Sequence, residues 1–205
     1  LFCATLMLFI FNYPAPVLCA DAAKSTSSES EQSHPDLNKL WEKIDKSKEH
    51  ITQLQERTKI SKGYTKKLLD ARLDRAWISL LEEKVRFAED TLKKTEEAPA
   101  GNRYRQKAAE MLGTQMSTAS IAIKRIMSSS ELPAPDLPTI DKAAAYARVF
   151  SAQEALNHTY DLLYQSLTLS EEYGLDTTEQ KSRFKKSLSE RAENASLILD
   201  ATAEQ

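Results

Sequence analysis

Residues 69–92 read LDARLDRAWISLLEEKVRFAEDTL and decide the fold, because their apolar residues recur at intervals of three and four. That spacing places the apolar residues on one side of an α-helix and the charged residues on the other. The stripe is wide and consists of Leu69, Leu73, Ala76, Trp77, Leu80, Leu81, Val85, Phe87, Ala88 and Leu92. We predict one helix over residues 64–97, which at about 1.5 Å per residue would be roughly 50 Å long.

The same spacing recurs on both sides of this segment. It predicts a helix from residue 36 up to a weak break at residues 61–63, and further helices over 103–127, over 139–172 and from residue 176 onward. The stripes are Leu37, Leu40, Trp41, Ile44, Ile51, Leu54 and Thr58 in the first helix; Tyr104, Ala108, Met111, Leu112, Met116, Ala119, Ile123, Ile126 and Met127 in the third; Ile140, Ala144, Ala147, Phe150, Leu156, Tyr160, Leu163 and Leu167 in the fourth; and Phe184, Leu188, Ala192, Ala195 and Leu199 in the fifth.

Capping and breaking residues mark the ends of these helices. Asp36 can cap the first helix, and a proline and a glycine in residues 98–102 end the second. Residues 128–138 hold three prolines and must form a loop. Gly174 is placed as a C-terminal cap, and Asp176 begins a capping-box-like start to the last helix.

These patterns predict an all-α fold, an elongated antiparallel bundle of long, coiled-coil-like helical hairpins with no β-sheet. No stretch alternates with period two long enough for a strand, and glycine is scarce, with four residues in the chain. We assign residues 36–205 to one periplasmic helical domain. Its last helix has no stop signal before Gln205, so we expect the domain to be truncated there.

The N-terminal segment predicts export. Residues 1–11 are an apolar run without a basic start, and residues 17–21 resemble a cleavage region, so residues 1–22 are interpreted as a signal peptide truncated at its start. Lipidation at Cys19 and retention as an uncleaved anchor are the alternatives. Residues 23–35 are Ser-rich and predict a disordered linker.

Cysteine use and charge limit the class of protein. Cys3 and Cys19 both lie in the export segment, so the rest of the chain has no disulfide, which suits a bacterial periplasm. The chain has 28 basic and 30 acidic residues, a formal net charge of −2. Because the two signs are interspersed, we expect no polybasic stripe for nucleic acid or anionic lipid, and no nucleic-acid partner.

No residue pattern indicates catalysis or metal binding. His34, His50 and His158 form no ligand set, and adjacent carboxylates such as those of Glu82 and Glu83 diverge on a helix. Trp41 and Trp77 fall on apolar stripes and are expected in helix–helix contacts rather than in a ligand site. We therefore predict no catalytic, cofactor-binding or metal-binding residue, no cofactor, and no enzyme activity.

Three segments in order carry a family resemblance. Residues 34–45 (HPDLNKLWEKID), residues 69–92 and residues 187–200 (SLSERAENASLILD) resemble the N-terminal periplasmic helical region of bacterial small-conductance mechanosensitive ion channel proteins. The resemblance implies a module on the periplasmic side of the inner membrane that assembles or gates a channel releasing solutes in osmotic shock. It also implies transmembrane and pore segments outside this sequence as partners, and a homo-oligomer.

The residues alone leave other classes open. A soluble periplasmic adaptor or scaffold that bridges envelope partners needs only the helical features already described. An enzyme with a helical accessory region is a third alternative. Apolar stretches of about 20 residues beyond Gln205 would favour the channel, a nearby stop codon the adaptor, and a catalytic motif the enzyme.

Overall fold

The computed structural model describes residues 34–96, 101–129 and 138–203, which form six α-helices and no strand. The helices are α1 (Pro35–Ile60), α2 (Gly63–Lys94), α3 (Arg103–Gly113), α4 (Gln115–Ser129), α5 (Thr139–Glu172) and α6 (Thr178–Ala203). The predicted all-α fold is confirmed for this part of the chain. The predicted signal peptide, most of the predicted linker and residues 130–137 of the predicted proline-rich loop lie outside the described residues, whereas Ser128 and Ser129 belong to α4 and not to the loop.

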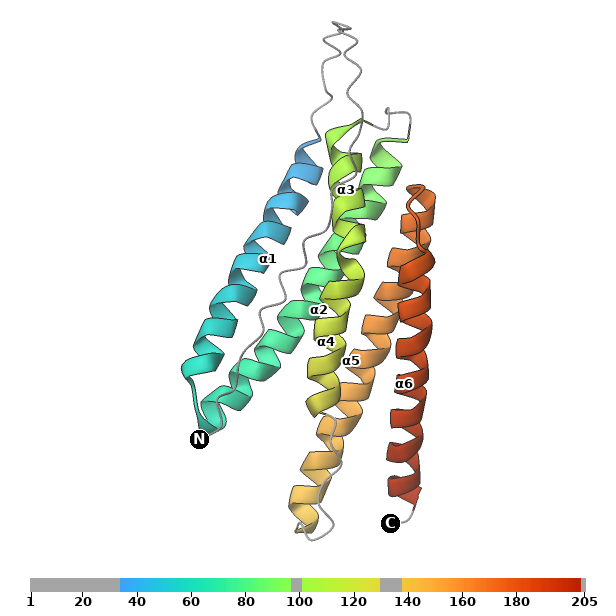
Figure 1. Cartoon of the computed structure of the whole chain (residues 1–205). Coiled ribbons are helices and arrows are strands. Elements are labelled where there is room, and N and C mark those ends of the chain that lie inside the picture. Colours follow the sequence, from blue (N-terminus) through green and yellow to red (C-terminus); the bar gives the residue numbers. More distant parts are fainter. Residues whose placement is uncertain (1–33, 97–100, 130–137, 204–205) are drawn as a thin grey trace, which may run out of the picture. The chain divides into compact units, whose positions relative to one another are not determined.

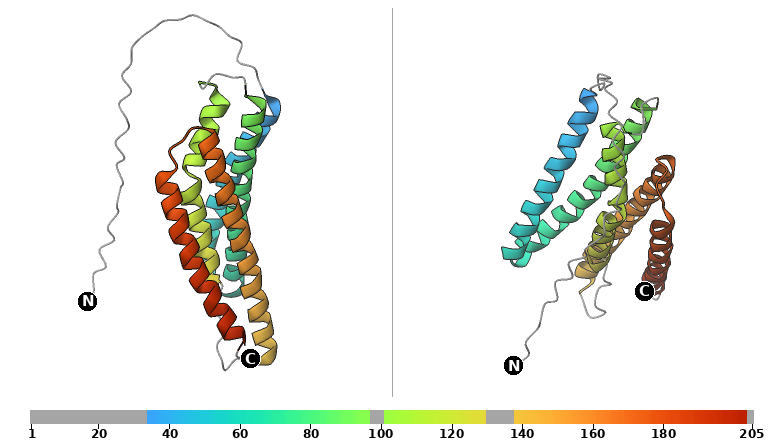
Figure 2. Two further views of the ribbon diagram at one scale, coloured as in Figure 1. Left: turned by 90° about the vertical axis from the view of Figure 1, so that its right-hand side faces the viewer. Right: turned by 45° about the horizontal axis from the view of Figure 1, so that its top comes forward.

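Successive helices run in opposite directions, with α3 and α4 following one another along the same path (Figures 1 and 2). Helix α2 is central, because α1, α3, α4 and α5 all pack against it. Helix α6 packs chiefly against α5. The molecule is therefore organised around one long helix, the one that residues 69–92 predict.

The connection between α1 and α2 is sharper than the sequence suggests. We predicted a weak break at residues 61–63, but only Ser61 and Lys62 separate the two helices, and α2 folds back along α1 (Figure 1). Gly63 has φ of +56°, a left-handed conformation that glycine adopts without a steric penalty. The left-handed conformation of Gly63 allows the chain to reverse direction here, so the predicted weak break is a complete hairpin turn.

The helix predicted over residues 103–127 is two helices. Thr114 interrupts it in a turn conformation, with φ −93° and ψ −3°, directly after Gly113. The side chain of the next residue, Gln115, is buried, and its Nε2 donates to the backbone oxygen of Leu81 at 2.9 Å. We attribute the break to this contact with α2 and to the low helix propensity of the Gly-Thr pair.

The N-terminal caps differ from the prediction at α1. Asp36 is not the cap; His34 occupies that position without a side-chain cap, and Pro35 begins the helix. The Asp36 carboxylate instead accepts a hydrogen bond from Lys94 at 3.2 Å. At α3, Asn102 is the cap, and its Oδ1 accepts from the backbone nitrogens of Tyr104 and Arg105.

The start of α6 follows the predicted motif in part. Asp176 accepts from the backbone nitrogen of Thr178 at 2.9 Å, and this hydrogen bond lowers the pKa of Asp176. The other carboxylate of the motif, that of Glu179, accepts from Arg183. Asp176 therefore satisfies a backbone donor at this end, whereas Glu179 pairs along the helix.

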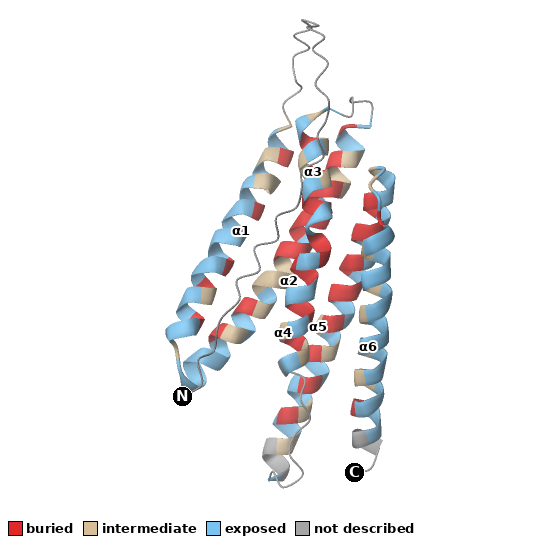
Figure 3. Ribbon diagram, viewed as in Figure 1, coloured by how far each residue is buried: buried red, intermediate tan, exposed pale blue. Residues whose placement is uncertain are grey.

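The core follows the predicted stripes closely in α1 to α4. Leu37, Ile44, Leu81, Phe87 and Tyr104 are fully buried. Each such side chain stabilises the fold by roughly 1.5–3 kcal/mol relative to an exposed one. Figure 3 shows the buried positions as a stripe on α1 and as a broad band over the central helices.

The predicted stripe is wrong in the first half of α5. Ala144, Ala147 and Phe150 are exposed, and Phe150 is 54% accessible, whereas Ala145 and Val149 are buried. The true stripe continues Ala145, Val149, Ala152, Leu156, Tyr160, Leu163 and Leu167. Neighbouring residues of a helix point in directions that differ by about 100°. The predicted stripe is displaced by one residue at Ala144 and therefore lies on a different face from the buried stripe, which begins at Ala145.

The predicted stripe of α6 is only partly buried. Phe184 packs against the core and Ile198 is buried, but Leu188, Leu197 and Leu199 are exposed. The contact with α5 centres on Tyr160, whose hydroxyl donates to the backbone oxygen of Ser187 at 2.8 Å and whose ring contacts Phe184. Helix α6 is therefore attached along one narrow face.

Gly174 ends α5 as predicted. Its nitrogen donates to the backbone oxygen of Glu171 and that of Leu175 to Ser170, both at 2.9 Å, which is a Schellman motif. Gly174 has φ of +70°, and a Cβ there would meet no atom within 4 Å. The cost of a side chain at this position is therefore a backbone cost alone.

We expect Gly174→Ala to lower the free energy of unfolding by about 1 kcal/mol, because alanine disfavours a positive φ. Urea unfolding monitored by circular dichroism measures this change. Gly113→Ala is the matched control: it lies within α3, also faces open space, and should raise stability by roughly 0.5–1 kcal/mol. A neutral or stabilising Gly174→Ala would show that the cap does not hold in solution.

Candidate functional site

The three histidines lie in different parts of the fold and do not form a common site. The backbone nitrogen of His34 donates to the Tyr104 hydroxyl at 3.2 Å, and the two rings meet edge to face. His158 on α5 lies 2.5 Å from the Glu82 carboxylate on α2, and His50 is exposed on α1. Among the described residues, no three His, Cys, Asp or Glu side chains gather as metal ligands would.

A buried tyrosine closes the bundle near the starts of α1 and α3. The hydroxyl of Tyr104 donates to Asn38 Oδ1 at 3.0 Å and accepts from Arg103 at 2.7 Å. The Tyr104 side chain is wholly inaccessible, and its hydrogen bonds to Asn38 and Arg103 are partly buried. The sequence predicted Tyr104 as a stripe residue but gave no sign of its polar partners.

Polar groups inside the bundle surround the break between α3 and α4. Lys84 on α2 is 4% exposed, and its ammonium donates to the hydroxyls of Thr114 and Thr118 at 3.2 and 3.1 Å. Burial lowers the pKa of Lys84 to about 8; the nearby Lys48 adds to that effect and Glu110 opposes it. An amine with such a pKa is a nucleophile when a substrate can reach it, but this one is enclosed by helices.

Two ion-pair clusters tie neighbouring helices to α2. Glu83, also buried, accepts from Ser47 at 2.7 Å and lies 3.1 Å from the Lys43 ammonium, both on α1. Arg125 on α4 lies 2.7 Å from Asp74 and 3.1 Å from Asp70. In the sequence these carboxylates have the pattern of a helix surface, and their role in joining helices was not predicted because it depends on residues far away in the chain.

A second tyrosine links the end of α5 to α2. The Tyr173 hydroxyl donates to the backbone oxygen of Ala88 at 2.8 Å, and the Arg105 guanidinium lies over its ring. Burial raises the pKa of Tyr173 to about 12, although Arg105 opposes this shift. The group therefore stays neutral and acts as a hydrogen-bond donor between helices.

An open groove of about 400 Å³ runs between α2 and α5. Its walls are Glu89, Leu92, Lys93, Tyr164, Gln165, Thr168, Leu169 and Glu172. Tyr164 is 65% exposed, and charged residues flank the apolar floor. Such a groove offers a contact surface for another chain, but it brings no nucleophile together with a base.

The tip of the α1–α2 hairpin presents a second surface, which we call the hairpin tip. It consists of the exposed residues Arg57, Lys59, Ile60, Lys62, Tyr64, Lys66, Lys67 and Leu68. Ile60 and Tyr64 are 83% and 82% exposed, and residues 57–69 contain no acidic residue. The net charge of the whole chain does not reveal this basic cluster, because acidic residues elsewhere balance it.

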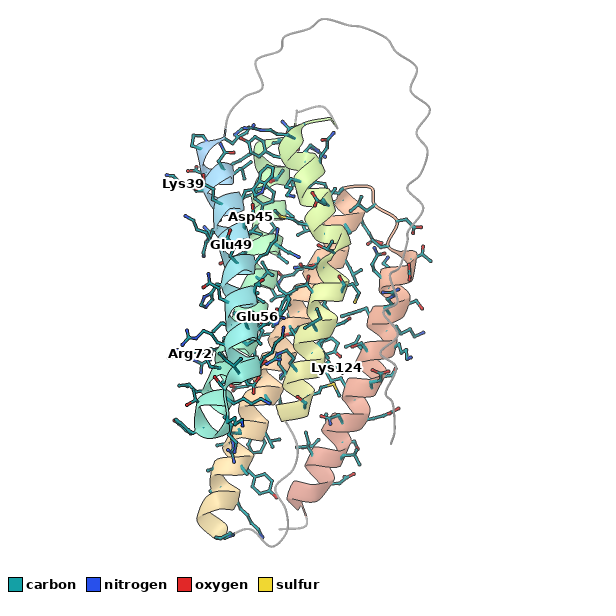
Figure 4. The ribbon with its side chains drawn as sticks, turned by 60° about the vertical axis from the view of Figure 1, so that its left-hand side comes forward. Lys39, Asp45, Glu49, Glu56, Arg72 and Lys124 are labelled. Atoms are coloured by element: carbon teal, nitrogen blue, oxygen red, sulfur yellow. The ribbon has the colours of Figure 1, made fainter. Side chains whose placement is uncertain are left out.

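The outer faces of the remaining helices are mixed in charge. Figure 4 shows Lys39 and Glu49 projecting outward from α1, and Arg72 from α2. Within the described residues, no helix combines the length and apolar content needed to cross a bilayer.

Residues 30–128 match a protein family described as MC3, ABC-three component (ABC-3C) system Middle Component 3. The match begins just before α1 and runs through α4 to its penultimate residue, and α5 and α6 follow it. No curated protein and no solved structure matches the chain.

The family match overturns the resemblance to mechanosensitive channels. Two of the three segments that suggested it, residues 34–45 and 69–92, fall inside the stretch matched by MC3. Both are amphipathic helices, and their spacing is shared by many helical proteins, so it cannot identify a family. The predicted roles in channel gating, ion transport and osmotic stress are wrong, and the adaptor alternative agrees only loosely with a description that names one component of a three-component system.

Proposed function

We propose that this chain is the middle component of an ABC-three component system and that it acts by binding the other components. The observation that carries the proposal is the match of residues 30–128 to the MC3 family. The matched residues correspond to α1–α4, the helices whose polar groups pair with one another. On this proposal the chain is a helical binding subunit and not an enzyme.

The contacts inside the matched region support a rigid module. Glu83 and Arg125 fix α1 and α4 to α2 through ion pairs, and Lys84 holds the junction of α3 and α4. Because these groups are occupied by internal partners, the surfaces left for other proteins are the outer faces, the groove between α2 and α5, and the hairpin tip. Rigid helical faces of this kind bind partners with little loss of conformational freedom.

Co-expression with the other two components from the same genome tests the proposal. We expect the full chain to co-purify with at least one of them through affinity capture and gel filtration. Light scattering then gives the copy number of each component and tests the predicted homo-oligomer. If the chain elutes alone in the presence of both components, it is not a binding subunit of such a system.

We also propose that residues 1–22 direct the chain to the periplasmic side of the inner membrane, as their apolar run suggests. Fractionation of cells that express the full chain, compared with a chain lacking residues 1–22, measures this. Recovery of both forms in the cytosol would contradict export without affecting the binding proposal.

A further inference from the structure

We propose that the hairpin tip docks the protein onto an anionic lipid surface. At the tip, exposed apolar side chains lie among exposed basic ones. The apolar residues are Ile60, Tyr64 and Leu68, and the basic residues are Arg57, Lys59, Lys62, Lys66 and Lys67. Figure 3 shows this end of α1 and α2 as an almost wholly exposed region.

The lysines at the start of α2 oppose the local stability of the helix. Helix α2 starts at Gly63; the preceding residue, Lys62, provides no side-chain cap, and the first turn has no acidic residue. Lys62, Lys66 and Lys67 lie there instead, at the positive end of the helix dipole, where cations destabilise a helix. A sequence that departs from local stability at one position is expected to have a functional reason there.

The tip keeps a net positive charge, because its nearest acidic residues neutralise only one of its five basic side chains, that of Lys59. Glu56 pairs with Lys59 at 2.7 Å, and Asp70 faces Arg125 at 3.1 Å on the side of α4. Residues 57–69 contain five basic residues and no acidic one. The tip therefore attracts an anionic partner.

The residue types of the tip favour a lipid surface over a protein partner. Lysine is depleted in protein–protein interfaces, whereas lysine-rich surfaces with exposed apolar and aromatic side chains are typical of segments that lie on membranes. A tyrosine places its ring at the level of the lipid headgroups, and lysines extend to the phosphates. The combination of Ile60, Tyr64 and four lysines at the hairpin tip fits a lipid surface better than a protein partner.

Binding of the full chain to lipid vesicles tests the proposal. The probes are phosphatidylcholine vesicles with and without about one-third phosphatidylglycerol, at low salt. The test variant is Lys62→Glu/Lys66→Glu/Lys67→Glu. The control Lys39→Glu/Lys46→Glu/Lys185→Glu reverses the same number of exposed lysines on α1 and α6.

We expect the tip variant to bind the anionic vesicles at least about tenfold more weakly than the wild type, and the control to stay within about twofold. The tip variant should unfold at the same temperature as the wild type or higher, because glutamates suit the start of a helix. Loss of binding then cannot be ascribed to loss of the fold. Equal binding of the wild type and the tip variant, or equal losses in both variants, would overturn the proposal.

A fluorescent label distinguishes lipid contact at the tip from lipid contact at residues 1–11, whose apolar sequence is a second place where lipid contact is to be tested. With Cys3 and Cys19 replaced by serine, an environment-sensitive dye is attached at Ile60→Cys or, as a control, at the exposed Glu193→Cys of α6. The emission of the dye at position 60 should shift to the blue on anionic vesicles, and that at position 193 should not. If both dyes stay in water, or if the tip variant loses a partner component or duplex DNA while its vesicle binding is unchanged, the proposal is wrong.

Discussion

Replacing Lys84 by methionine is expected to raise the free energy of unfolding by about 3 kcal/mol at pH 7. The ammonium is buried and is held by two threonine hydroxyls, not by a carboxylate. Burial lowers its pKa from 10.5 to about 8, and each unit of that difference corresponds to about 1.4 kcal/mol. Methionine keeps the length of the side chain and removes the charge, and Thr114 and Thr118 retain backbone acceptors for their hydroxyls.

The same lowered pKa of Lys84 also determines how stability depends on pH. Between pH of about 8 and about 10.5, Lys84 is charged in the unfolded chain and increasingly neutral in the folded one. The unfolded state then binds more protons, so stability rises with pH across this window. The wild type should gain stability there relative to Lys84→Met, which lacks the titrating group.

Urea unfolding of both proteins at pH 7 and near pH 10 measures the two effects. Lys124→Met, at an exposed lysine on α4, is the matched control and should change stability by less than about 0.5 kcal/mol. A Lys84→Met protein that is less stable at pH 7 would mean that the ammonium contributes more to the fold than its two hydroxyl partners indicate.

Truncation of Phe87 to alanine is expected to cost about 3–5 kcal/mol. Phe87 is fully buried on α2 and meets the Trp41 ring of α1 edge to face, with centroids 6.3 Å apart. Removing its ring leaves a cavity between the first two helices that the neighbouring side chains fill only in part. Unfolding in urea, with the slope compared to the wild type, measures the loss.

Phe184→Ala serves as the comparison, because it removes the same ring from a less enclosed position. Phe184 is only half-buried between α5 and α6, so its loss should cost about 1 kcal/mol. Similar costs for the two variants would contradict the view that α6 is attached along a narrow face.

The parts of the fold that were predictable are those with a regular apolar period. The stripes from Leu37 to Thr58 and from Leu69 to Leu92 were placed correctly, since burial of an amphipathic face leaves little choice of orientation. In α5 apolar residues lie on several faces, and Phe150 and Tyr164 stay exposed while alanines are buried. Residue type there does not reveal the face that packs.

The polar contacts could not be predicted, because each joins residues far apart in the chain. The sequence gives no direct sign that Lys84 contacts Thr114 and Thr118, because both lie far from it in the chain. The sequence held one usable sign, a charged Glu83-Lys84 pair inside an apolar run. The hairpin tip is different: its lack of acidic residues is visible locally and was obscured by averaging charge over the whole chain.

The central position of α2 has a consequence for folding kinetics. Because α1, α3, α4 and α5 all pack on α2, we expect the transition state for folding to contain part of that helix. Substitutions in the buried face of α2 should therefore slow folding, whereas those in α6 should mainly accelerate unfolding. The helix that residues 69–92 encode would then set the rate at which the whole bundle is acquired.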